Sequence, residues 1–199
     1  MKKIVFALSF FLSLLIFSSQ QIFSQESKAE NKSLTKKLEK EKKKQEKEAA
    51  ALAERQKYAE MLQDKYFVFM ANTLAGDAGA TYSVTPKFNF LGVYGETAVF
   101  QFAFDGIVGW NGIGGITLTG EVEDYQFDPG KNSKKPMRVT GKMKSSTHWG
   151  RPYFTLTVFG GGYASITMTV KGGTINMDGQ IVEPEDSGVY QGSEILIDK

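Results

Sequence analysis

The sequence predicts an all-β domain, a meander of about eight antiparallel strands preceded by an N-terminal helix. Two observations predict it. Between residues 66 and 192, short segments alternate apolar and polar side chains with a period of two, which is typical of strands that bury one face. Short turns rich in Gly, Asn and Asp join these segments. No helical segment there is long enough to cross over between parallel strands, so an antiparallel meander is expected.

The clearest alternation lies in PMRVTGKMK, where Met137, Val139, Gly141 and Met143 share one face. Two aromatic segments, YFVFMANTL and FNFLGVYG, are further candidate strands because aromatic residues favour pleated sheets. The other expected strands each carry one apolar face, formed by Phe100, Phe102 and Phe104; Ile116, Leu118, Gly120 and Val122; Phe154, Leu156 and Val158; Ala164, Ile166, Met168 and Val170; and Ile175, Met177, Gly179 and Ile181.

Three glycines favour closure of the sheet. Gly120, Gly141 and Gly179 occupy apolar-face positions near the middle of their strands, and glycine there permits the sharp coiling that a small barrel requires. We therefore expect a small lipocalin-like barrel or half-open barrel, whose interior is filled by side chains or holds one small ligand. A two-sheet β-sandwich is the alternative.

The N-terminus has the layout of a secretory signal peptide. Lys2 and Lys3 precede a short apolar run, and a polar segment follows from Ser18. Cleavage is expected after Ser24, and an uncleaved membrane anchor is the alternative. The sequence contains no cysteine, which excludes a lipoprotein, a disulfide framework and a thiolate metal site. The mature protein is expected to be periplasmic or secreted, with no transmembrane span after cleavage.

A charged helical arm is expected between the signal peptide and the β-domain. The segment contains neither Gly nor Pro and is rich in strong helix formers. Residues 28–65 carry 12 basic and 8 acidic side chains, whereas residues 66–199 carry 10 basic and 13 acidic ones. Because lysines and glutamates are interleaved, the arm is interpreted as a solvated spacer, and contact with an acidic surface is the alternative. Export, together with a single Tyr and a single Arg in the arm, argues against nucleic acid as a partner.

The predicted organisation has four parts, which are a signal peptide at 1–24, the charged arm at 25–65, the barrel-like domain at 66–192 and a C-terminal tail at 193–199.

Several blocks of the β-domain resemble the DUF4251 family of exported Bacteroidetes proteins. They are YFVFMANTL, NGIGG, GGITLTGEVEDYQFD and GGGYASITMTVKGGTINMDGQI, in an order and spacing that hold from about Tyr66 to Gly192. The resemblance implies a signal peptide or lipoprotein start, a helical lead-in and an all-β domain. The family has no characterised function or site to carry over. Where relatives have an LPYFG block this chain has FAFDG, and Asp105 introduces a carboxylate there.

The glycine-rich stretch GIVGWNGIGGI, residues 106–116, is interpreted as a connection between strands. A dinucleotide-binding loop needs G-x-G-x-x-G followed by a helix. Here Gly112 and Gly114 are followed by Thr117 at the third glycine position, and the segment that follows is an expected strand. The sequence contains no phosphate-binding G-x-x-x-x-G-K-[ST] motif either.

A ligand-binding mouth is expected around this connection. Three phenylalanines lead into it, and two tryptophans lie beside glycines in expected loops, where they could line an apolar pocket or stack on a glycan, or simply plug the barrel end. The candidate ligand-binding residues are Phe100, Phe102, Phe104, Asp105, Trp110 and Trp149.

Other chemistry has weaker support in the sequence. Glu121, Glu123, Asp124 and Asp128 form an acidic group that could attract Ca²⁺, but they lack the spacing of a calcium loop and fit a solvated strand face equally well. His148 is the only histidine, and a catalytic role would need a positioned nucleophile beside it. We therefore predict no catalytic residue, metal or cofactor.

The function expected from the sequence is that of a non-enzymatic exported cell-envelope protein that binds a small apolar ligand or a glycan. A carboxylate-dependent hydrolase and an adaptor that docks through the helical arm are the alternatives. The partner is unknown, with a small apolar ligand or an envelope component as the candidates.

Overall fold

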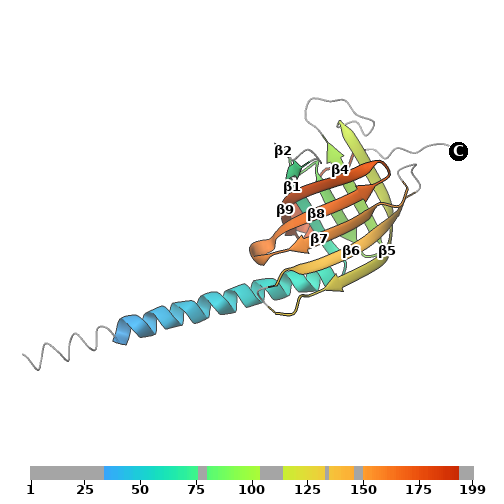
Figure 1. Ribbon diagram of the computed structural model, residues 1–199. Coiled ribbons are helices and arrows are strands. Elements are labelled where there is room, and N and C mark those ends of the chain that lie inside the picture. The colour runs from blue at the N-terminus through green and yellow to red at the C-terminus, as the bar shows by residue number, and fades with distance from the viewer. Residues whose placement is uncertain (1–33, 76–79, 104–113, 133–134, 146–149, 193–199) are drawn as a thin grey trace, which may run out of the picture. The chain divides into compact units, whose positions relative to one another are not determined.

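The computed structural model describes residues 34–75, 80–103, 114–132, 135–145 and 150–192 (Figure 1). The chain divides into two compact units, Met1–Ala50 and Ala51–Lys199. In the first unit the described residues, 34–50, are helical and exposed. This helix extends to residue 63 within the second unit. Among the described residues, no helix is both long and apolar enough to cross a membrane.

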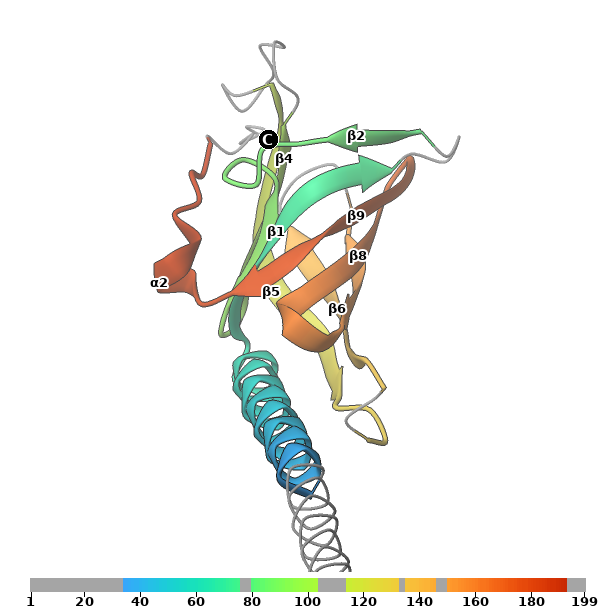
Figure 2. The same cartoon turned by 90° about the vertical axis from the view of Figure 1, so that its left-hand side faces the viewer.

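The second unit is a closed barrel of eight antiparallel strands with one extra strand, which confirms the predicted fold class and rules out the sandwich (Figure 2). The sheet order is β2-β1-β3-β4-β5-β6-β7-β8-β9, and pairing of β1 with β9 closes it. The strands are β1 (Tyr66–Ala75), β2 (Thr81–Ser83), β3 (Phe90–Tyr94), β4 (Thr97–Ala103), β5 (Gly115–Asp128), β6 (Met137–Ser145), β7 (Tyr153–Val158), β8 (Tyr163–Val170) and β9 (Gly173–Val182).

Strand β1 holds the barrel together because it pairs with three strands. Along one edge it pairs with β9 through most of its length. Along the other edge its first half pairs with β3, and its last three residues pair with β2. The three residues of β2 are too few to show an alternating pattern, so the sequence did not predict this strand. Two short helical turns were also not predicted, η1 (Gly160–Gly162) and α2 (Pro184–Ser187).

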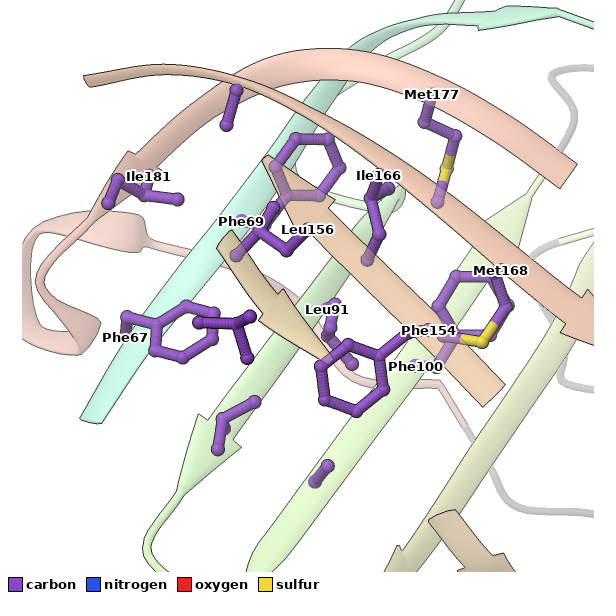
Figure 3. Close-up of a cluster of buried hydrophobic side chains, with 14 of the residues drawn as sticks. Phe67, Phe69, Leu91, Phe100, Phe154, Leu156, Ile166, Met168, Met177 and Ile181 are labelled. Carbon is purple, nitrogen blue, oxygen red and sulfur yellow. The ribbon is translucent and has the colours of Figure 1, made fainter. Parts of the chain in front are cut away.

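Side chains fill the barrel interior in the described part of the chain. The apolar faces predicted from the alternation meet in one buried cluster, and Figure 3 shows side chains from β1, β3, β4, β7, β8 and β9 converging there. The ring of Phe154 occupies the space beside Gly141, where an added Cβ would come within 2.7 Å of that ring. An eight-stranded barrel is narrow enough for side chains to fill it, and the side chains of this buried cluster do so.

Two of the predicted mid-strand glycines mark places where backbones approach closely. A Cβ on Gly179 would lie 1.9 Å from the carbonyl oxygen of Met70, and one on Gly120 would lie 2.7 Å from that of Lys144. The β1–β9 register shifts next to Gly179, between Ala71 and Thr73. Both glycines therefore allow neighbouring backbones to approach more closely than a side chain would permit, and Gly179 does so beside the irregularity where β1 and β9 close the barrel.

A bulge in β5 changes the direction of its last side chains. The register with β6 shifts between Glu123 and Gln126, and Asp124 has a positive φ of 51°. As a result, Tyr125 and Phe127 pack against the core. Alternation alone predicted the inward face of β5 only as far as Val122, because one bulged residue changes the phase of every later side chain.

The last turns of the helix cover one end of the barrel. Met61 and Leu62 are buried in the core cluster, and the hydroxyl of Tyr125 donates a hydrogen bond to the Leu62 carbonyl. Burial raises the pKa of Tyr125 above its ordinary value, so this hydroxyl keeps its proton and remains a donor. Tyr58, about one turn earlier in the helix, packs against Gly162, and its ring occupies the space that a side chain at position 162 would need. These contacts explain why the compact unit begins at Ala51, within the segment predicted as the arm.

Replacing Gly179 with Ala tests the close approach of β1 and β9. We expect Gly179→Ala to lower the free energy of unfolding by about 2–3 kcal/mol, because the new methyl overlaps backbone that cannot turn away. Gly173→Ala, in the same strand, is the matched control, since nothing lies within 4 Å of an added Cβ there. Urea unfolding of both variants measures the difference, and equal stabilities would contradict the packing described.

Candidate functional site

The barrel end opposite the helix presents five half-buried apolar side chains. They pack against the buried core and remain partly exposed. We call them the apolar rim: Val84, Phe102, Ile116, Val170 and Ile175. The strand register brings them to one end, because Phe102 pairs with Ile116 between β4 and β5. Val84 directly follows β2, Val170 ends β8 and Ile175 lies near the start of β9.

Two of the predicted site residues lie on β4 and belong to this end of the core. Phe100 is fully buried, and its ring centroid lies 6.0 Å from that of Phe102. Phe100 is therefore a packing residue beneath the rim, whereas Phe102 is only partly buried and belongs to the rim itself. The other predicted residues, Phe104, Asp105, Trp110 and Trp149, lie outside the described residues.

The chain segments that carry these four residues connect strands that end beside the rim. Residues 104–113 follow Ala103 at the end of β4, and residues 146–149 follow Ser145 at the end of β6. The prediction of a mouth near the glycine-rich connection therefore points to the same end of the barrel as the apolar rim.

A buried hydrogen-bond network centred on Gln101 lies on the outer side of β4, next to the rim residue Phe102. Gln101 is fully buried, and its amide nitrogen donates to the carbonyl oxygens of Phe88 (3.1 Å) and Tyr190 (2.8 Å). Its carbonyl oxygen accepts from the Thr117 hydroxyl (2.8 Å) and from the backbone N–H of Gly192 (2.7 Å). All four hydrogen-bonding positions of this amide are filled, which is what a buried glutamine requires.

The network holds a C-terminal strap, residues 183–192, against the outside of the barrel. Val189 of the strap packs on Val68, Phe90 and Val99, which point outward from β1, β3 and β4 and are nevertheless buried. The Tyr190 N–H also bonds to the Lys87 carbonyl at 3.0 Å. Because Gln101 and Thr117 neighbour the rim residues on β4 and β5, the strap supports the rim from behind.

Sequence reasoning missed this strap, although a signal for it was present. In β4 the run Ala98, Val99, Phe100 is apolar on both faces, and continuous apolar runs are typical of strands that are covered on both sides. The polar Gln101 directly after that run was a second sign, since a glutamine inside a buried strand must find partners.

Three members of the acidic group on β5 pair with basic side chains on and beside β6. Asp124 lies 2.7 Å from the Lys142 ammonium, and Glu121 lies 3.5 Å from that of Lys144. Glu123 lies 3.3 Å from the Arg151 guanidinium. Within the described ranges, no group of three or more His, Cys, Asp or Glu side chains could hold a metal ion. Glu121, Glu123 and Asp124 therefore form a ladder of ion pairs along the strand, whereas Asp128 accepts a hydrogen bond from the backbone N–H of Gly130 at 2.8 Å. His148, the histidine considered for catalysis, lies outside the described residues.

The fold and site define a class, a small closed antiparallel β-barrel with a filled interior, a helix at one end and an apolar rim at the other. The chain belongs to the DUF4251 family, as its resemblance predicted. The family's sequence model, described as "Domain of unknown function (DUF4251)", matches residues 42–181.

A solved structure agrees with this assignment. The crystal structure, at 1.95 Å resolution, of a DUF4251 family protein from Bacteroides eggerthii DSM 20697 is similar to this chain, with 25% sequence identity and a TM-score of 0.55. The similarity covers 70% of this chain and 93% of that one. No curated protein matches the chain significantly. These comparisons establish family and fold.

Removing the buried amide tests the support of the rim. Gln101→Leu leaves the Gly192 N–H and the Tyr190 carbonyl without this partner, so we expect a loss of about 2–4 kcal/mol in the free energy of unfolding, since an unpaired buried polar group costs about 1–3 kcal/mol. Amide hydrogen exchange should also become faster at residues 189–192. Gln191→Leu is the matched control, because that side chain is exposed and makes only a 3.5 Å bond to Thr119. Equal effects of the two changes would contradict the strap's role.

The ion-pair ladder predicts a small dependence of stability on pH. The hydrogen bond from Lys142 holds the pKa of Asp124 below its ordinary value. The stabilisation is therefore complete above the ordinary pKa of an aspartate and is lost as the pH falls through the lowered value in the folded state. We expect Asp124→Asn, which tolerates the positive φ, to be less stable than the wild type at neutral pH and equal to it in strong acid. Urea unfolding at several pH values measures this, and a difference that does not change with pH would contradict it.

Proposed function

We propose that this protein is a non-enzymatic binding protein of the cell envelope, and that it takes up a small apolar ligand at the apolar rim. The observation that carries the proposal is the contrast between the two ends of the barrel. At one end the helix buries Met61 and Leu62 in the core and packs Tyr58 and Ala59 against it, whereas at the other end the five apolar rim side chains pack on the core and stay partly exposed.

The filled interior limits the size and depth of the proposed ligand. Phe100, Phe154 and Met168 are fully buried beneath the rim, so a ligand cannot enter the barrel without displacing them. A group that rests on the rim instead buries its own apolar surface together with that of Phe102 and Ile116. Burial of that surface contributes about 25 cal/mol per Å², which supports binding of an acyl chain end or another compact apolar group.

The polar side chains around the barrel support binding over catalysis. The carboxylates that sequence reasoning considered for a hydrolase, Glu121 and Glu123, are engaged by Lys144 and Arg151. A general acid or base has to be positioned against the reacting group, whereas these two carboxylates are held by basic side chains along β5. The predicted signal peptide supports placement of the protein outside the cytoplasm.

Ligand binding at the rim is tested by replacing one phenylalanine at each end of the barrel with alanine. Decanoic acid and decanol, titrated against the mature chain and followed by tryptophan fluorescence and thermal shift, are the probes. We expect both to bind and to raise the melting temperature. Phe102→Ala should weaken binding at least about tenfold, since it removes roughly 1.5–3 kcal/mol of apolar contact.

Phe127→Ala is the matched control, because Phe127 is also half-buried on the core but lies at the helix end of β5. It should lower stability in a similar way and leave the affinity unchanged. Equal weakening by the two substitutions, or no binding of either probe by the wild type, would overturn the proposal. Binding of the acid alone would show that a carboxylate, and not the apolar group, is recognised.

A further inference from the structure

The helix of the first unit separates charges that the sequence interleaves. Residues 34–50 hold seven lysines and four glutamates, and they are helical and exposed. Side chains three, four or seven positions apart lie on one face of an α-helix. This spacing joins Lys36, Lys40, Lys43 and Lys47 in a single row, and Lys44 lies beside it. We call these five residues the lysine face.

The glutamates border this face on its two sides. Glu41 and Glu48 are seven residues apart and share one flank, and Glu39 and Glu46, also seven apart, share the other. Along the sequence, lysines and glutamates alternate closely enough for their charges to cancel. In the helix, the lysines instead form a positively charged row about 17 Å long, at 1.5 Å per residue. The only ion pair recorded among the described residues of this unit joins Lys44 and Glu48 at 3.9 Å.

The composition of the segment indicates which kind of anion suits it. Residues 34–50 contain no arginine and no aromatic residue, so they lack the planar fork and the ring faces that read nucleic-acid bases. Lysine ammonium groups are strongly hydrated point charges on flexible stems. They suit a plane of mobile phosphate groups, where no fixed geometry is demanded, and clusters of four to eight lysines on a helix are typical of segments that bind anionic lipid headgroups.

We infer that the lysine face is a docking surface for an anionic phospholipid bilayer, held by charge at the level of the headgroups. The face itself has no large apolar side chain, and Leu34 and Leu38 lie on the opposite side of the helix. The helix therefore lies on the headgroups without inserting. The site is separate from the apolar rim, and its test does not depend on any ligand of the barrel.

Vesicle binding of the mature chain, from Gln25 onward, tests the inference. The probes are phosphatidylcholine vesicles with and without 30% phosphatidylglycerol, measured by co-sedimentation. We expect binding only to the anionic vesicles and a steep loss of binding as NaCl rises, because salt screens exposed charges within about 10 Å at 0.1 M. Replacing Lys36, Lys40, Lys43 and Lys47 with Gln should lower the partition coefficient several hundredfold, at about fivefold per lysine.

A charge-matched variant separates the lysine face from net charge. Lys87, Lys131, Lys135 and Lys171 are exposed lysines of the barrel unit, and changing these four to Gln removes the same charge. This variant should bind anionic vesicles nearly as well as the wild type, and both variants should keep the helical circular dichroism of the wild type, because Gln and Lys have similar helix propensities.

Three outcomes would overturn the inference, namely equal loss of binding in the two variants, binding that is independent of salt or of phosphatidylglycerol, and retention on a DNA or heparin column without binding to vesicles. The last outcome would assign the face to a soluble polyanion instead of a bilayer.

Discussion

Closure of the sheet between β1 and β9 is the constraint on which the rest of the structure depends. Closure removes free sheet edges and forces eight strands around a narrow interior, which their inward side chains then fill. It is possible only where backbones approach closely, as at Gly179 against Met70. Because inward side chains of the described residues fill the interior, the proposed ligand has to bind at an end or on the outside. Closure therefore determines where we propose the ligand site.

The two ends of the barrel differ because the chain covers them differently. The helix that leads into β1 brings Met61 and Leu62 onto one end. At the other end the strap supports β4 and β5 from outside through Gln101, while the inward side chains at the rim remain partly exposed. A rigid support behind a partly exposed apolar surface is a suitable arrangement for binding, since little order has to be created when a ligand arrives.

The sequence was sufficient to predict the barrel because alternation and turn residues are local signals. Every inward face proposed from the period of two agrees with the buried cluster for the described residues, and Gly141 lies where the Phe154 ring needs room. The sequence was insufficient where the local structure depends on contacts between residues far apart in the chain. The bulge at Asp124, the three-residue β2 and the strap on Gln101 depend on partners far along the chain. Of the predicted site, Phe102 lies on the rim and Phe100 beneath it.

The central claim is that the filled barrel binds an apolar ligand on its rim and not inside. Methyl chemical shifts measured by NMR during a decanol titration test it most directly. We predict shifts of the Ile116, Val170 and Ile175 methyl groups, with those of the buried Ile166 and Met143 unchanged. Large shifts of the Ile166 and Met143 methyl groups would contradict the account, because they would show that the ligand opens the core.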